Sequence, residues 1–222
     1  MFPKFATVAG LLVFSALCLS SCDFEDLYSK DEKKETSSEV VFKGKVLDEI
    51  TGNPLELTEV STNPITITVV TNSSGEYTIN QSLQADKNYT INFAKYGYLE
   101  KQITQLARVG YNEVGQSLME RDTTTFTFIN VLIRDNDNNL VAGAVVTYAG
   151  VGKSYTGTTD ATGIFSMPIP KTSTTQTFSI KAPGFKDVSG TYNVYSGTCT
   201  NVVNGTTTAQ SGAVIVQLQP SI

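Results

Sequence analysis

The sequence predicts an all-β protein built from two tandem antiparallel β-sandwiches. Short runs such as 65–69 and 89–93 alternate apolar with polar residues, and a period of two is typical of half-buried strands. Turn-forming clusters such as 51–54 and 72–75 separate the runs. No stretch shows a convincing 3.6-residue period, and short strands at this spacing favour sandwiches over helical folds.

The second half of the chain repeats landmarks of the first half. Thr71–Ile79 matches Thr159–Met167 at an offset of 88 residues, and Phe93–Tyr98 matches Ile180–Phe185 at an offset of 87. Two landmarks with nearly the same offset indicate two copies of one domain, each large enough for its own core. The expected domains are 40–121 and 122–222.

The first 21 residues have the pattern of an export signal. Lys4 precedes an apolar run, Phe5–Leu19, of 15 residues, which is too short to span a bilayer as a helix. The run ends in Leu19-Ser20-Ser21-Cys22, which resembles the lipobox of bacterial lipoproteins. The resemblance implies cleavage before Cys22 and a membrane anchor of three acyl chains, palmitate among them, on that cysteine. The alternative is an ordinary secretion signal with an incidental cysteine.

Residues 22–39 are expected to form a flexible tether after the lipid. Residues 23–39 contain seven acidic and three basic side chains without apolar periodicity. The cluster Asp23, Glu25 and Asp26 resembles the export signal of Bacteroidetes-type surface lipoproteins. This resemblance implies that the protein lies on the outer membrane and faces the cell exterior; a plain polar spacer is the alternative.

Both expected domains resemble the carboxypeptidase regulatory-like domain, an Ig-like sandwich of the transthyretin-like type. Gly44–Asp48, Thr51–Leu55 and Lys95–Tyr98 occur in the family order in the first domain, and Val131–Asp135 and Ala182–Phe185 occur in the second. The resemblance implies seven strands per sandwich and carries no information about activity.

Each domain departs from the family pattern at one place. Leu55–Glu59 lacks the usual start of the second strand, so that strand is expected to be displaced. The second domain is longer within Asp187–Gly212, a Thr/Ser/Gly-rich stretch. We expect an extended hairpin or a mobile loop there, with a role that the sequence does not give. Ala213–Leu218 is expected to close the second sheet.

Composition argues against most enzymatic chemistry. Histidine is absent, which excludes Ser-His-Asp and Cys-His activation and histidine metal sites. Once the signal is removed and Cys22 carries the lipid, Cys199 is the one remaining thiol, so no disulfide is expected. The neighbours of Cys199 offer no base, so no cysteine nucleophile is expected. Asp135–Asn139 begins like a calcium loop, but Leu140 and Val146 replace the required Gly and Glu. We therefore expect no enzyme activity, no cofactor and no metal.

Charge and aromatic residues narrow the class of partner. The net charge is −5, with 16 basic against 21 acidic residues, so nucleic acid is not an expected partner. Tyr96, Tyr98 and Tyr111 are candidate glycan contacts, although Tyr98 at a family core position equally fits packing, and no Trp is present. Thr123, in Asp122-Thr123-Thr124, resembles a short O-glycosylation motif; a polar linker is the alternative.

These observations predict a non-enzymatic surface lipoprotein that acts as a binding, adhesion or scaffolding module. The alternative is a glycan-binding accessory protein of an outer-membrane polysaccharide-uptake system. The expected partners are the membrane, through the lipid, and a protein or glycan ligand. Sandwich edges can also accept a partner strand. The sequence identifies neither the ligand nor the oligomeric state.

Overall fold

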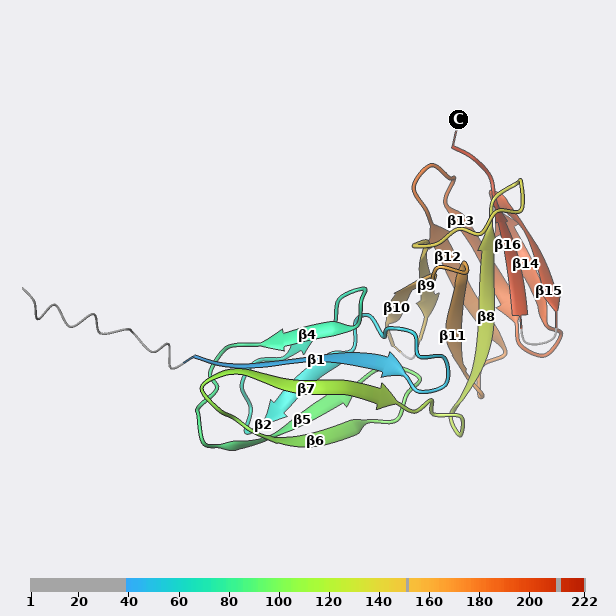
Figure 1. Ribbon diagram of the computed structural model, residues 1–222. Helices are drawn as coiled ribbons and strands as arrows, with labels where there is room; N and C mark the ends of the chain where they lie inside the picture. The colour runs from blue at the N-terminus through green and yellow to red at the C-terminus, as the bar shows by residue number, and fades with distance from the viewer. Residues whose placement is uncertain (1–38, 151, 211–212, 222) are drawn as a thin grey trace, which may run out of the picture. The chain divides into compact units, whose positions relative to one another are not determined.

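The computed structural model describes residues 39–150, 152–210 and 213–221 (Figure 1), and these belong to one compact unit. Within this part of the chain the structure contains β-strands and no helix. The expectation of an all-β fold with tandem sandwiches is confirmed. The expected signal and most of the expected tether lie outside the described residues.

The first sandwich packs a three-stranded sheet against a four-stranded sheet. The three-stranded sheet has the order β4 (Glu76–Ile79), β1 (Val40–Asp48), β7 (Gly110–Met119). The four-stranded sheet has the order β3 (Val69–Val70), β2 (Glu59–Asn63), β5 (Asn88–Ala94), β6 (Lys101–Leu106). Alternate residues of these strands form the core, in which Phe42 meets Tyr89 edge-on and Tyr77 meets Phe93 edge-on.

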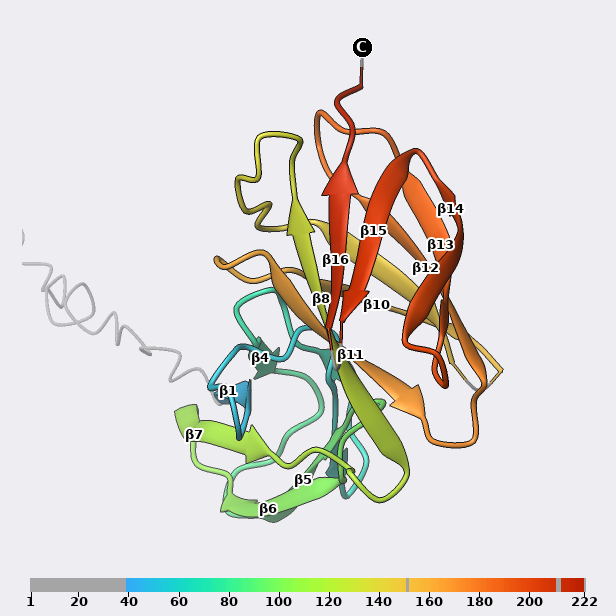
Figure 2. The same ribbon diagram turned by 90° about the vertical axis from the view of Figure 1, so that its right-hand side faces the viewer.

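The second sandwich has the same plan with one more strand in each sheet (Figure 2). One sheet has the order β11 (Ile164–Pro170), β8 (Phe126–Arg134), β16 (Ala213–Leu218), β15 (Gly205–Gln210). The other has the order β10 (Ser154–Thr158), β9 (Val145–Ala149), β12 (Thr175–Lys181), β13 (Val188–Asn193), β14 (Thr198–Val203).

The two sandwiches therefore correspond strand for strand, with β14 and β15 as additions. The Asp187–Gly212 extension contains both additional strands, and β13 and β14 pair as the antiparallel hairpin that was expected. β16 does not end its sheet, because it lies between β8 and β15. The pairs β1–β7 and β8–β16 are parallel, which the expectation of purely antiparallel sheets left out.

A buried threonine explains why the turn sequences repeat. The Thr71 hydroxyl donates to the Leu55 carbonyl and accepts the N–H of Thr58. Thr159 makes the same two kinds of bond in the second sandwich, with the carbonyl and N–H that precede β9. Both threonines are buried, so each hydroxyl satisfies two backbone groups that water does not reach.

One predicted strand was wrong. The alternating run 65–69 is not a strand; β2 ends at Asn63, and β3 is confined to Val69–Val70. Pro64 lacks the N–H that a continuing ladder would need, and this is the physical reason that β2 stops there. β2 begins at Glu59, and the expected displacement of the second strand relative to the family pattern stays a prediction.

Candidate binding groove at the junction of the sandwiches

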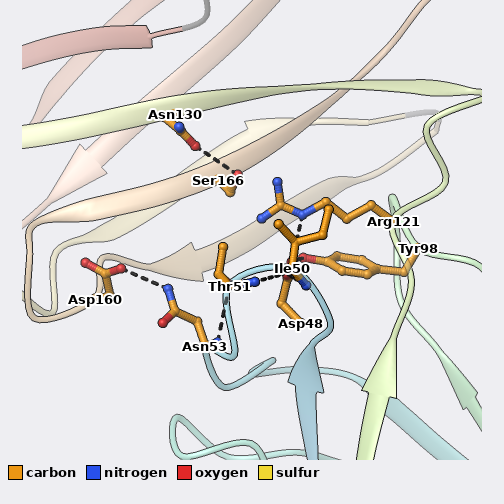
Figure 3. Close-up of polar contacts among 9 residues, drawn as sticks. All are labelled: Asp48, Ile50, Thr51, Asn53, Tyr98, Arg121, Asn130, Asp160 and Ser166. Carbon is orange, nitrogen blue, oxygen red and sulfur yellow. Dashed lines mark hydrogen bonds and ion pairs between the residues drawn. The ribbon is translucent and has the colours of Figure 1, made fainter.

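A buried carboxylate lies at the end of β1, where the two sandwiches meet (Figure 3). Asp48 Oδ2 lies 2.7 Å from Arg121 Nε and accepts the hydroxyl of Tyr98 at 2.7 Å. Its Oδ1 accepts the N–H groups of Ile50 and Thr51. Burial alone would raise the pKa of Asp48, but the hydrogen bonds from Arg121, Thr51 and Tyr98 bring it below its ordinary value.

Arg121 and Tyr98 also contact the second sandwich. The Arg121 guanidinium carbon lies 4.7 Å from the centroid of the Phe128 ring, and Tyr98 meets the same ring edge-on at 5.8 Å. Burial, and then the negative charge of Asp48, raise the pKa of the Tyr98 phenol. The hydroxyl therefore stays protonated and keeps donating to Asp48, which ties the ion pair to the junction.

Two side-chain hydrogen bonds and one close approach complete the junction. Asn53 Nδ2 donates to Asp160 Oδ2 at 2.9 Å, as Figure 3 shows, and the Thr158 hydroxyl donates to Glu56. Gly97 has a φ of +90°, and a Cβ there would lie 2.6 Å from Cβ of Pro168. A side chain at this position would push the two surfaces apart, so the close packing depends on glycine.

A groove of about 440 Å³ lies beside this junction and is lined by both sandwiches. Its walls combine tyrosine rings with side chains of both charges and a few apolar groups. The first sandwich contributes Leu57, Glu59, Val70, Ala94, Lys95, Tyr96, Tyr98 and Glu100. The second contributes Tyr148, Lys153, Ser154, Tyr155 and Thr156. Convergent polar groups in a concave site are typical of ligand pockets.

The tyrosines of the groove are packed against one another. Tyr96 stacks on Tyr155 with centroids 3.9 Å apart and meets Phe126 edge-on at 4.8 Å. Tyr155 is also within stacking range of Tyr148. Lys153 Nζ lies 5.0 Å from the centroid of the Tyr155 ring. Most of these ring faces are therefore occupied, and a ligand would meet the rings through their edges and hydroxyl groups.

Lys95 is an inward-facing cation in the groove. Its Nζ donates to the backbone carbonyl of Glu56. Burial lowers the pKa of Lys95 to about 8, and the charge of Glu56 opposes that effect. A lysine held in this way can present its remaining N–H donors to a ligand with little loss of side-chain entropy.

Leu57 adds an apolar rim in an unusual backbone conformation. Its φ is +55°, in the left-handed region that a branched side chain rarely adopts. The side chain is 44% exposed and lines the groove. The N–H of Leu57 donates to the Thr71 carbonyl, which holds this conformation in place. Backbone strain of this kind concentrates at functional sites.

The structure separates the three predicted glycan contacts. Tyr96 and Tyr98 line the groove, whereas Tyr111 lies on β7 and is 73% exposed, with Lys43 Nζ 4.2 Å from its ring centroid. Thr123 is exposed in a turn in which Asp122 accepts the N–H groups of the following threonines. Lys171 donates to the Thr123 carbonyl, so this linker segment is a hydrogen-bonded turn.

The remaining predicted site residues fall into two groups. Leu19, Ser20, Ser21, Cys22, Asp23, Glu25 and Asp26 lie outside the described residues. Cys199 lies half-buried on β14, and burial raises the pKa of its thiol. Asp135 accepts the N–H groups of Asp137 and Asn139 and acts as a turn former.

The described ranges contain neither a cluster of metal-ligating side chains nor a membrane-spanning helix. No group of three or more acidic, Cys or His side chains there is arranged to hold a metal ion. The same ranges contain no helix long and apolar enough to cross a membrane.

Sequence reasoning missed the half of the groove that the second sandwich supplies. Tyr148 and Tyr155 are cross-strand partners in the β9–β10 hairpin. Their symmetric spacing about the Gly150 and Gly152 turn was a local signal for that pairing. Nothing local indicated that the hairpin would face Tyr96.

Comparison with protein families identifies the first sandwich. Residues 42–126 match the family model of the CarboxypepD_reg-like domain. These residues form a CarboxypepD_reg-like domain. The match confirms the expected family for the first sandwich and does not extend to the second. No curated protein matches the chain.

Comparison with solved structures gives distant likenesses. The Bacillus anthracis TIE protein is 17% identical, with a TM-score of 0.32, over 82% of this chain and 34% of that chain. The C-terminal fragment of pilus adhesin SpaC from Lactobacillus rhamnosus GG is 15% identical, with a TM-score of 0.32, over 83% and 98%. The shaft pilin SpaA from the same organism is 12% identical, with a TM-score of 0.33, over 83% and 98%. Likenesses at these scores do not bear on function.

Proposed function

We propose that this protein is a lipid-anchored, non-enzymatic binding module that faces the exterior of the outer membrane and holds its ligand in the junction groove. The groove carries the proposal, because it brings together Lys95, Lys153 and four tyrosines from two sandwiches fixed by the Asp48–Arg121 pair. The lipobox-like Leu19–Cys22 and the acidic cluster that follows support the anchor and its orientation.

The lack of histidine throughout the chain supports a binding role rather than catalysis. We also propose that the second sandwich is another domain of the carboxypeptidase regulatory-like type, extended by β14 and β15. The support is that all seven strands of the first sandwich correspond to strands of the second.

Protease shaving of intact cells tests the location, with a periplasmic protein as the control. The protein is expected to be cleaved while the control survives, and Cys22→Ala is expected to release the protein from membranes. If the protein survives until the outer membrane is broken, the proposed surface orientation is wrong. If the Cys22→Ala variant stays tightly bound to membranes, the proposed lipid anchor is wrong.

A second candidate is a glycan-binding accessory protein of a polysaccharide-uptake system. The observation that favours it is the polar lining of the groove, where hydroxyl, carboxylate and ammonium groups surround tyrosine edges. Retardation of the protein in gels containing soluble polysaccharides tests this function. Lys153→Ala is expected to abolish the retardation, whereas Tyr111→Ala, outside the groove, is expected to leave it unchanged. The reverse result would exclude the groove as the glycan site.

A further inference from the structure

The outer edge of β6 has no neighbouring strand within the described residues. β6 is the last strand of its sheet, beside β5. The corresponding strand of the second sandwich, β13, lies between β12 and β14. The same position in the architecture is therefore covered in one sandwich and open in the other.

The two strands can be aligned residue by residue. Lys101 of β6 pairs with Phe93, and Val188 of β13 pairs with Ile180. Lys101 and Val188 are 87 positions apart in the chain, and so are Phe93 and Ile180. The β5–β6 pair and the β12–β13 pair therefore have the same register. Ser189, Thr191 and Asn193 are among the β13 residues that have partners in β14, and that pairing shifts its register between Ser189 and Thr191. The residues of β6 at these three positions are Gln102, Thr104 and Leu106.

Backbone directions agree with that alignment. The N–H of Ala107 donates to the Lys87 carbonyl, and the Ala107 carbonyl accepts the N–H of Asp86. Ala107 therefore directs both backbone groups toward the β5 side. Because these directions alternate along a strand, Gln102, Thr104 and Leu106 direct their N–H and C=O groups toward the open edge. Their side chains are exposed as well.

Two other sheet edges, β11 and β7, carry features that discourage pairing, whereas β6 carries few. The edge strand β11 contains Pro168 and Pro170, and the β1–β7 register is interrupted between Lys43 and Gly44. β6 has no proline, its pairing with β5 has no register shift, and its single charge is at Lys101. An unblunted edge of this kind is a template for another strand.

We propose that β6 pairs antiparallel with β6 of a second copy of this chain, about a twofold axis at Thr104. In this register Thr104 lies opposite its own counterpart, and Gln102 lies opposite Leu106. The three outward-facing residues then satisfy one another's backbone groups. Thr–Thr cross-strand pairs are favourable, and a self-complementary edge gives a closed dimer.

Charge complementarity supports a second copy as the occupant. The same register places Glu100 of one copy opposite Arg108 of the other, and the twofold axis repeats the contact. Both side chains are exposed, and neither forms an ion pair among the residues that the structure describes. A self-paired β6 therefore gains two intermolecular ion pairs at its ends.

Disulfide trapping in membranes tests the proposal on the whole protein. Thr104→Cys is introduced together with Cys199→Ser, and the membranes are oxidised with copper-phenanthroline. Directly opposed hydrogen-bonded residues have Cα atoms about 5.5 Å apart, within disulfide reach. A dimer of twice the monomer mass is expected. Thr78→Cys, an exposed threonine on β4, is the control and is expected to stay monomeric.

Charge reversal tests the register. Glu100→Arg is expected to lower the rate of trapping about tenfold by replacing two attractive contacts with repulsion. Adding Arg108→Glu is expected to restore it. The proposal is overturned if Thr104→Cys gives no dimer, if it is trapped with a different protein, or if charge reversal has no effect. Unchanged protease resistance of each variant confirms that it is folded.

Discussion

The carboxylate of Asp48 lies 2.7 Å from Nε of Arg121, although the two residues are 73 positions apart in the chain. Their side chains are 2% and 12% exposed, respectively. The pair joins the end of β1 to the segment that leads into the second sandwich. The contact of Arg121 with the Phe128 ring extends this connection to β8.

Removal of Arg121 is expected to destabilise the protein strongly. Arg121→Met leaves a buried carboxylate without its cation, and breaking a buried pair in this way costs about 3–5 kcal/mol. Urea denaturation measures the loss. Lys181→Met is the control, because Lys181 and Asp187 form an exposed pair and its loss should not move the midpoint. Equal effects of the two substitutions would contradict a structural role for the buried pair.

Acid is expected to weaken the fold through Asp48. The pKa of Asp48 is lower in the folded protein than its ordinary value of 3.8. The stabilisation is therefore complete above pH 3.8 and is lost as the pH falls below that value and through the folded pKa. The stability difference between the parent and Asp48→Asn should shrink over this range. Parallel pH profiles would show that the carboxylate does not contribute.

A rise in pH above about 8 is expected to stabilise the fold through Lys95. Its folded pKa is about 8, below the ordinary 10.5. Between pH 8 and 10 the unfolded chain binds a proton that the folded protein does not, so stability rises with pH. Thermal melts of the parent and of Lys95→Met check this. The parent should gain stability relative to the variant over that interval, and a constant difference would refute the burial of Lys95.

A side chain at Gly97 is expected to disturb the junction. Gly97→Ala places a Cβ against Pro168 in a left-handed backbone conformation. Gly52→Ala is a matched control, because Gly52 also has a positive φ but a Cβ there meets nothing within 4 Å. Left-handed strain costs each variant roughly 1–2 kcal/mol, and the Gly97 variant should lose more. Limited proteolysis between residues 121 and 125 should accelerate for that variant alone.

The buried hydroxyl of Thr71 is expected to be essential for stability. Thr71→Val leaves the buried Thr58 N–H without its partner and takes one of two hydroxyl donors from the Leu55 carbonyl, which still accepts from the Thr58 hydroxyl; leaving the N–H unsatisfied costs about 1–3 kcal/mol. Urea denaturation of Thr78→Val, an exposed position on β4, gives the comparison. A similar midpoint for both variants would mean that other groups satisfy these backbone atoms.

Local patterns predicted most of the architecture, and the groove shows where they stop being informative. Tyr98 and Phe185 occupy equivalent positions, but Tyr98 carries a hydroxyl that reaches Asp48. The side-chain pattern marked both as packing residues without indicating this bond. Tyr96 stacks on Tyr155, 59 residues later, and no local signal relates two such rings.

The amino-acid pattern was sufficient for the strands, the turns and the duplication, because alternation and turn chemistry act between residues close in the chain. The pattern also located the extension, although not its division between β14 and β15. Only the folded arrangement decided which tyrosines share a groove, which carboxylate is buried against Arg121, and which strand edge stays open. These outcomes depend on contacts between distant segments, whose formation is governed by the packing of whole sheets and not by neighbours in sequence.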